Sequence, residues 1–434
     1  MKLHDRRLGQ DVRELASLLG DVLAEQTSRR AFETVEGVRR ASIAYRRGEA
    51  SSREDVVREL SGLAPQRQGV VARAFTTYFE LINLAEERER VRAIRRASQG
   101  DELDDSLAVA AQELAETDPA TVERVLEDVE VVPTFTAHPT EARRKTVKSK
   151  LRTVAGRIET LDERRLTDLE AEQVWRDVEA EVESLWQTPQ LRKRRPEPED
   201  EARNVQWYLE NTLFSIAGEV YDELERAFEE RGLDVDVPEL FRFRSWAGSD
   251  RDGNPFVTPE VTENTLERQR RVALAKYVEE LARLSGVLSQ DGDRIDAGES
   301  FTAGLEADRE RLPGTAEAAA ERYPDEPYRQ KLYLMRERLS RVDDVRPGGY
   351  ADADEFIDDL STMAESLRAN KADTVADVAV DPLRRCAETF GFTLAALDLR
   401  DHRENHTRAI DEALSRQGMD YRELDEAERQ ELLT

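Results

Sequence analysis

The sequence has little cysteine and no long hydrophobic run. Its 434 residues include one cysteine, Cys386, so no disulfide can form within the chain and a reducing compartment is expected. No segment approaches the roughly 18 consecutive apolar residues of a membrane-spanning helix, and the first residues lack the apolar core of a secretion signal. These absences predict a soluble, cytoplasmic protein that does not bind membranes.

Positive charge is also scarce. The chain has 93 acidic residues against 65 Lys and Arg, for a net charge of −28. A surface this negative repels phosphate backbones and anionic lipid headgroups, so nucleic acids and membranes are not expected partners. Only eight of the basic residues are lysines. Acid excess with Arg in place of Lys is typical of proteins from salt-saturated cytoplasm, where screening weakens self-repulsion, and it predicts a halophilic source.

Most of the chain has the three- and four-residue spacing of apolar side chains that predicts helices. Helices are expected over residues 11–23, 72–91, 145–185, 204–231, 259–289, 315–341 and 354–369. Three β-favouring runs interrupt this pattern, at residues 129–137, 240–246 and 391–399. Because helical stretches separate them, the runs predict parallel strands within an α/β framework that is predominantly helical.

Three strands cannot close a barrel, which needs about eight. The protein is therefore either an unusual helical protein or a chain that ends before its sheet is complete. Residues 425–434 have a charged helical pattern with no natural finish, which favours the second interpretation. Where parallel strands end, functional side chains gather, and here those ends hold His138, residues 250–255 and Arg400.

His138 follows the first β-favouring run and precedes Pro139. A residue before proline is pushed out of the α-helical region, so His138 should lie on a turn. Residues 138–150 carry a net charge of +4, against the trend of the chain, and Thr140 can cap a helix whose first N–H groups point toward the histidine. A titratable base beside an anion-binding helix terminus suits phosphoryl or carboxylate chemistry, although a packed or surface histidine is the alternative.

Residues 245–255 combine two glycines with the run Asp250-Arg251-Asp252. The alternating acids resemble a calcium loop, but Pro255 stands where that loop needs glycine and Val261 where it needs glutamate. The segment instead predicts a tight loop that approaches a ligand. An ion-paired structural turn is the alternative, and the two roles can coexist if the carboxylates orient arginines.

Arg400 directly follows the third run, and at a strand end its guanidinium is well placed to bind a phosphate with two hydrogen bonds. His402 and His406 have the spacing of two metal ligands on one helical face. Because no carboxylate or cysteine cluster accompanies them, no metal site is predicted.

Together these segments resemble the phosphoenolpyruvate carboxylase family. Residues 135–142 match the family motif Phe-Thr-Ala-His-Pro-Thr-Glu-Ala throughout, and residues 245–255 match a second motif except that Ser249 replaces a glycine. Residues 185–198 also resemble a family segment. A third motif is matched at Leu397, Asp398, Arg400 and His406.

The resemblance implies carboxylation of phosphoenolpyruvate with bicarbonate to oxaloacetate and phosphate, with Mg²⁺ as the metal. Bicarbonate would attack phosphorus to give carboxyphosphate and the pyruvate enolate, which then captures the carbon dioxide released. His138 would act as general base, Arg400 would hold phosphate oxygens, and Trp246 would help to exclude water. The other substrate-binding residues that it implies are Arg144, Lys145, Asp250, Arg251, Asp252 and Asn254.

Family members are about twice as long as this chain, and their Mg²⁺ ligands and catalytic lysine lie in the other half. The resemblance therefore implies an amino-terminal half that is inactive alone, with a helical region at residues 1–130 and the first part of a TIM-type (β/α) barrel with large helical insertions at residues 131–434. At full length it implies a homotetramer. A non-catalytic anion-binding module and a histidine phosphotransfer protein are the alternatives, and Pro139 opposes the mid-helix histidine that the latter needs.

Overall fold

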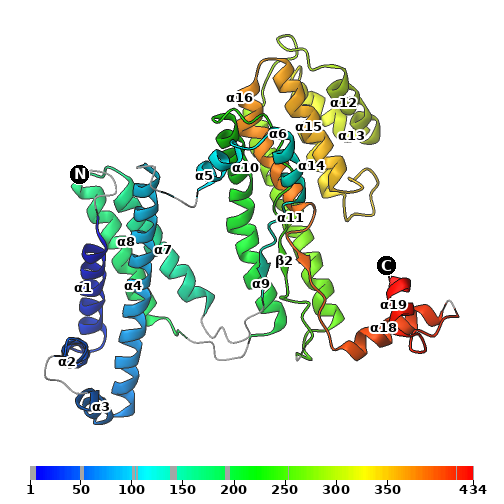
Figure 1. Ribbon diagram of the computed structural model, residues 1–434. Coiled ribbons are helices and arrows are strands. Elements are labelled where there is room, and N and C mark those ends of the chain that lie inside the picture. The colour runs from blue at the N-terminus through cyan, green and yellow to red at the C-terminus, as the bar shows by residue number, and fades with distance from the viewer. Residues whose placement is uncertain are drawn as a thin grey trace. The chain divides into compact units, whose positions relative to one another are not determined.

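Helices dominate the structure, as the apolar spacing predicts (Figure 1). A computed structural model describes residues 6–48, 53–99, 103, 106–136, 144–190, 196–252, 254–416 and 418–433. Within these ranges, none of the helices combines the length and apolar character that crossing a bilayer demands.

The first group of helices precedes the second strand. These are α1 (Leu8–Gln26), α2 (Arg29–Arg46), α3 (Arg53–Ser61), α4 (Pro65–Gln99), α5 (Leu107–Leu114), α6 (Pro119–Asp128), α7 (Lys145–Glu163), α8 (Asp168–Gln187), α9 (Pro198–Tyr208), the π-helical η1 (Leu209–Leu213) and α10 (Phe214–Glu229). The remaining helices follow it. They are α11 (Pro259–Val287), α12 (Glu299–Arg311), α13 (Pro313–Arg322), α14 (Pro327–Ser340), α15 (Ala353–Ala369), α16 (Asp373–Val375), the π-helical η2 (Ala376–Val380), α17 (Asp381–Phe390), α18 (Arg403–Ser415) and α19 (Glu426–Leu433).

Two predicted helices are each broken into two. The helix expected over 145–185 divides into α7 and α8 because Thr167 starts a new helix, its hydroxyl and the Glu170 carboxylate forming a capping box. The helix expected over 315–341 divides into α13 and α14, since Pro327 at the first position of α14 cannot continue a preceding helix.

The chain forms two compact units by its internal contacts. The first comprises Met1–Asp104 and Glu141–Arg195, and the second comprises Asp105–Thr140 and Pro196–Thr434. The predicted domains, a helical region at residues 1–130 and the first part of a barrel at residues 131–434, stay a prediction.

The first unit is a helical bundle. Helices α1 and α4 run side by side, and α7 packs on α8 (Figure 1). Between the helices lies an apolar core that includes Leu15, Leu81 and Ile158, and beside it Arg92 is buried between two carboxylates. Its Nη2 donates to Asp11 Oδ2 at 2.7 Å and its Nε donates to Asp162 Oδ2 at 2.7 Å, so this buried charge is paired.

The second unit contains the strands. β1 (Thr134–Phe135), β2 (Arg244–Ser245) and β3 (Ala396–Leu397) form one parallel sheet in that order. Parallel pairing of the three β-favouring runs is therefore confirmed, although the strands are shorter than the runs. Single bridges extend the pairing, Val131 with Phe241 and Asp250 with Arg400. The largest apolar core lies in this unit, where the Phe243 ring stacks on Phe390 with centroids 5.3 Å apart.

Candidate functional site

The carboxyl ends of β2 and β3 bring together side chains more than 140 residues apart in sequence. The bridge between Asp250 and Arg400 continues the β2–β3 pairing past the strands. The Arg251 N–H donates to the Arg400 carbonyl at 2.7 Å, and the Arg400 N–H donates to the Ser249 carbonyl at 3.4 Å. The backbone thus fixes where the predicted loop and the predicted arginine meet.

The Arg400 guanidinium lies over the Trp246 indole. Its central carbon is 4.2 Å from the ring centroid, within the range of a cation–π interaction. Its Nη1 donates to Asp250 Oδ2 at 3.4 Å, which is a long contact for an ion pair. The side chain is 42% exposed, so the stacked and tethered guanidinium still faces solvent. A weakly held, solvent-facing guanidinium on an aromatic surface is well suited to binding an oxyanion.

Asp398 holds the other edge of the indole. The Trp246 Nε1–H donates to Asp398 Oδ2 at 3.1 Å, and Arg244 Nη1 donates to Asp398 Oδ1 at 3.3 Å. Neither residue was expected in the site: Asp398 was recognised only as part of the third motif, and Arg244 was not singled out at all. The alternation of strand side chains is the signal that could have found them, since Asp398 and Arg400 are two apart on β3 and its extension, and Arg244 and Trp246 are two apart on β2.

Gly248 shapes the loop that carries these groups. Its φ is +89°, and a Cβ built on it would lie 2.5 Å from Thr265 Oγ1. Its carbonyl accepts a hydrogen bond from Thr262 Oγ1 at 2.8 Å, so the loop is anchored to α11. The next residue, Ser249, is fully buried and replaces a glycine of the resembled motif. Its φ is not positive, so a side chain there costs no backbone strain.

The other loop residues mainly order the loop. Arg251 Nη2 donates to Thr262 Oγ1 at 3.3 Å, and the Asp252 N–H donates to Asp250 Oδ1 at 3.1 Å. Asn254 Oδ1 accepts from the Phe256 N–H at 3.2 Å. These hydrogen bonds fit an ion-paired structural turn, and they leave room for the same loop to face a ligand. The substrate-binding roles of Arg251, Asp252 and Asn254 stay predictions.

Arg144 and Lys145 lie in the first unit, at the start of α7. The Arg144 N–H donates to the Gln190 carbonyl at 3.2 Å, and its Nη1 donates to the Pro189 carbonyl at 3.5 Å. Lys145 is exposed, and the first turn of α7 has no acidic residue. Cations are unfavourable beside the positive end of a helix dipole, so an anion bound there would relieve that repulsion.

His138 and Arg143 lie outside the described residues. Of the histidines near Arg400, His402 caps α18, and its Nδ1 accepts from the Glu404 N–H at 3.4 Å. Hydrogen bonds from the Asn405 side chain and the His402 N–H lower the pKa of the neighbouring Asp401. In the part of the chain that the structure describes, no group of three or more His, Cys, Asp or Glu side chains could hold a metal ion.

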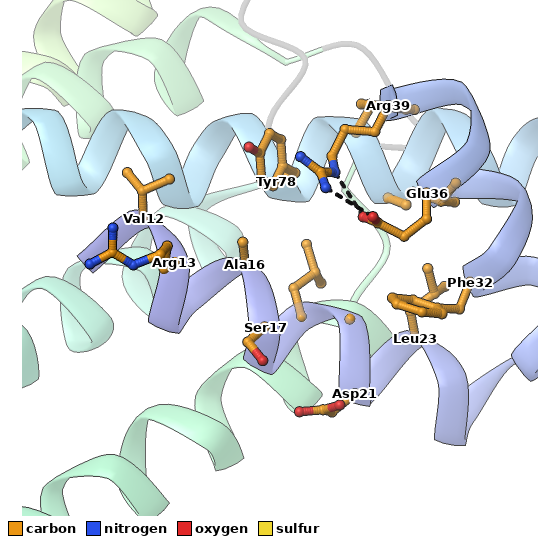
Figure 2. Close-up of a pocket in the computed structure, with 15 residues that line it drawn as sticks. Val12, Arg13, Ala16, Ser17, Asp21, Leu23, Phe32, Glu36, Arg39 and Tyr78 are labelled. Atoms are coloured by element: carbon orange, nitrogen blue, oxygen red, sulfur yellow. Dashed lines mark hydrogen bonds and ion pairs between the residues drawn. The ribbon is translucent and has the colours of Figure 1, made fainter. Parts of the chain in front are cut away.

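A cavity of about 400 Å³ lies elsewhere, between α1, α2 and α4 of the first unit (Figure 2). Leu23, Phe32 and Tyr78 contribute to its apolar lining, and Arg39 at its rim is already paired with Glu36, at 2.8 and 2.9 Å. No residue that the sequence places in the site lines this cavity.

Comparisons with known proteins agree on one family. The sequence profile described as phosphoenolpyruvate carboxylase matches residues 8–434. A phosphoenolpyruvate carboxylase of Roseiflexus castenholzii is 36% identical, over 99% of this chain and 48% of the relative. One of Xanthomonas euvesicatoria is 36% identical over 96% of this chain and 47% of the relative, and one of Paraburkholderia xenovorans is 33% identical over 99% and 45%. The chain therefore spans about half the length of these curated relatives.

Proposed function

This chain belongs to the phosphoenolpyruvate carboxylase family, and on that premise we propose that it supplies part of an active site that carboxylates phosphoenolpyruvate. The reaction would consume bicarbonate and release oxaloacetate and phosphate. The observation that carries the proposal is the Arg400 guanidinium, stacked 4.2 Å over Trp246 at the carboxyl end of a parallel sheet and 42% exposed. Such a group binds a phosphate on one side while its aromatic support keeps water from the other.

Each site residue has a proposed task. Arg400 binds phosphate oxygens, and Trp246 forms an apolar wall that limits protonation of the enolate. His138 acts as general base toward carboxyphosphate, which releases carbon dioxide beside the enolate. Arg144 and Lys145 add positive charge for the anionic substrates, although lysine cannot reproduce the two-pronged contact of an arginine.

The wider setting is also proposed. The chain would be the amino-terminal half of a cytoplasmic homotetramer, its three strands the first part of a TIM-type barrel. By the family resemblance, Mg²⁺ would serve the reaction from ligands in the half of the relatives that this chain does not cover. The net charge of −28 and the scarcity of lysine support a halophilic source.

Titration calorimetry of the whole chain with phosphoenolpyruvate tests the proposal. We expect binding in the millimolar range or tighter, and binding weaker by about tenfold or more for Arg400→Gln, since a charged hydrogen bond contributes roughly 1.5–3 kcal/mol. Arg416→Gln is the matched control, because this arginine is 79% exposed and its contact with Glu412 is 3.7 Å long. Absence of binding by the wild-type chain, or equal affinities of the two variants, would contradict the proposal.

A turnover assay tests the proposal that the chain is inactive alone. With phosphoenolpyruvate, bicarbonate and Mg²⁺, the chain should release no phosphate above background. Sustained release by the chain by itself would overturn this part of the proposal.

A binding module without turnover is the second candidate function. It is favoured by the position of Arg400 within a chain that spans about half the length of its relatives. A module that recognises only the oxyanion would bind inorganic phosphate and phosphoenolpyruvate equally, whereas an active-site fragment should prefer phosphoenolpyruvate.

A further inference from the structure

We propose that Asp398 is a positioning residue that determines where Arg400 presents its guanidinium, acting through the Trp246 indole. The inference rests on the proposed function in one respect, that the anion bound by Arg400 is phosphoenolpyruvate. Asp398 would not contact that anion. Its task would be to hold the aromatic surface on which the arginine lies.

The first step concerns the indole. Trp246 is half-buried, and its ring orientation depends on two side-chain torsions. The hydrogen bond from Nε1 to Asp398 Oδ2, at 3.1 Å, ties the polar edge of the ring to β3, while the Trp246 N–H donates to the Phe135 carbonyl of β1 at 2.8 Å. The ring is thus held by its backbone on one side and by Asp398 at its far edge.

The second step concerns Asp398 itself. Its N–H donates to the Ser245 carbonyl at 3.1 Å, which places it in the β2–β3 register. Its second carboxylate oxygen, Oδ1, accepts from Arg244 Nη1 at 3.3 Å. Both oxygens therefore have partners, so the carboxylate is held firmly enough to orient another group.

The third step concerns Arg400. One face of its guanidinium is covered by the indole at 4.2 Å, and Nη1 reaches Asp250 Oδ2 at 3.4 Å. Among the described residues, the Nη2 and Nε groups of Arg400 have no polar partner, and no hydrogen bond or ion pair joins Asp398 to Arg400. The indole therefore determines the plane of the guanidinium, and the free N–H groups in that plane are the ones available to an oxyanion.

A spectroscopic experiment tests the link between Asp398 and Trp246. The uniformly ¹⁵N-labelled chain should show four indole N–H resonances, since it has four tryptophans, and Trp246→Phe identifies the one from Trp246 by its loss. We expect Asp398→Leu to shift this resonance strongly and the other three little, because the hydrogen bond is lost. In Asp398→Asn the resonance should stay near its wild-type position, since the amide oxygen still accepts a hydrogen bond. Asp401→Asn, three residues further along, is the control and should move none of them.

A binding experiment tests whether Asp398 acts through the indole. When Trp246 is intact, Asp398→Leu should weaken phosphoenolpyruvate binding about tenfold, and Asp398→Asn should weaken it at most about threefold. In a Trp246→Phe background the indole N–H is absent, so Asp398→Leu should add less than about twofold. Arg244→Gln should resemble Asp398→Asn, because the acceptor for the indole remains.

Three results would overturn the inference. The first is a Trp246 resonance that does not move in Asp398→Leu. The second is a double variant, Asp398→Leu with Trp246→Phe, whose loss of affinity equals the product of the two single losses. The third is an Asp398→Asn variant that loses as much affinity as Asp398→Leu. If the three other indole resonances show that Asp398→Leu is misfolded, Asp398→Ala, which also removes the acceptor, replaces it in both experiments with the same expected results. Failure of the wild-type chain to bind phosphoenolpyruvate contradicts the proposed function, while the resonance shifts still decide the role of Asp398.

Discussion

At the scale of single residues, Gly248 is a position in the candidate site where both the backbone conformation and the available space oppose a side chain. Gly248→Ala would require an alanine at φ +89° and a Cβ 2.5 Å from Thr265 Oγ1. We expect the free energy of unfolding to fall by roughly 1–3 kcal/mol. Urea denaturation measures this change. Gly286→Ala is the control, since nothing lies within 4 Å of a Cβ there, and it should be neutral or slightly stabilising. Equal effects of the two substitutions would refute the prediction.

Glu355 is the residue with the clearest predicted pH dependence. Burial by itself would raise the pKa of its carboxyl, but hydrogen bonds from Arg311 and the Ala351 N–H, together with the Arg338 charge, outweigh burial and lower the pKa from 4.5 to about 2. Because the folded-state pKa is the lower one, the carboxylate stabilises the fold fully above about pH 5. That contribution is lost as the pH falls toward 2.

The change Glu355→Gln should therefore lower the free energy of unfolding by roughly 1–2 kcal/mol at pH 7, a figure reduced for solvent screening because the carboxyl is 33% exposed. The difference from wild type should shrink between pH 5 and pH 3, as followed by urea denaturation at each pH. Glu365→Gln on the same helix is the control, because Glu365 is exposed and should show neither effect. A difference that is constant with pH would argue against the assigned cause.

At the scale of secondary-structure elements, the contact of α10 with α17 depends on Gly218. A Cβ on Gly218 would lie 2.6 Å from the Pro382 carbonyl oxygen and 2.8 Å from its Cα, so the two helices would have to separate. We expect Gly218→Ala to lower the free energy of unfolding by roughly 1–3 kcal/mol. Gly156→Ala in α7 meets nothing within 4 Å and should stabilise the chain by roughly 0.5–1 kcal/mol. Thermal or urea unfolding should therefore show that Gly218→Ala destabilises the chain and that Gly156→Ala stabilises it. Stability changes of the same sign in both variants would contradict the prediction.

The helices and strands of the structure agree in part with those predicted from the sequence. Apolar spacing predicted α1, α11 and α15 within a few residues, because each buries one face. It missed the break before Thr167, where a local capping box outweighs a continuous apolar stripe. The parallel pairing of the strands followed from their helical connections, whereas their order in the sheet was not predicted. The short length of the strands could not be predicted, since it depends on tertiary pairing and not on the composition of each run.

The candidate site was predictable in part. The family resemblance rested on motifs and is confirmed by the profile match over residues 8–434. The meeting of Asp250 and Arg400 followed from the rule that functional residues gather at the carboxyl ends of parallel strands, whereas Trp246 was expected near them only from the family resemblance. The hydrogen bond from Trp246 to Asp398 could not be predicted from either motif alone, because it joins side chains 152 residues apart.

At the scale of the whole molecule, charge should govern stability in salt. A net charge of −28 repels itself most at low ionic strength, since the screening length falls from about 10 Å at 0.1 M to about 3 Å at 1 M. We expect the urea midpoint to rise between 0.1 and about 2 M KCl. A variant that neutralises four exposed glutamates should show a smaller rise. Suitable positions, none of which forms an ion pair with another described residue, are Glu113, Glu127, Glu179 and Glu260. A midpoint that stays flat or falls would contradict the prediction.

The two units are interleaved along the chain, since each is assembled from two separate stretches: Met1–Asp104 with Glu141–Arg195, and Asp105–Thr140 with Pro196–Thr434. During synthesis the first unit cannot close until α8 has left the ribosome, and by then β1 of the second unit has already emerged without its partner strand. An exchange of either unit between relatives must therefore transplant two stretches at once, and a hybrid made with a single crossover within residues 1–195 leaves at least one unit with parts from both parents.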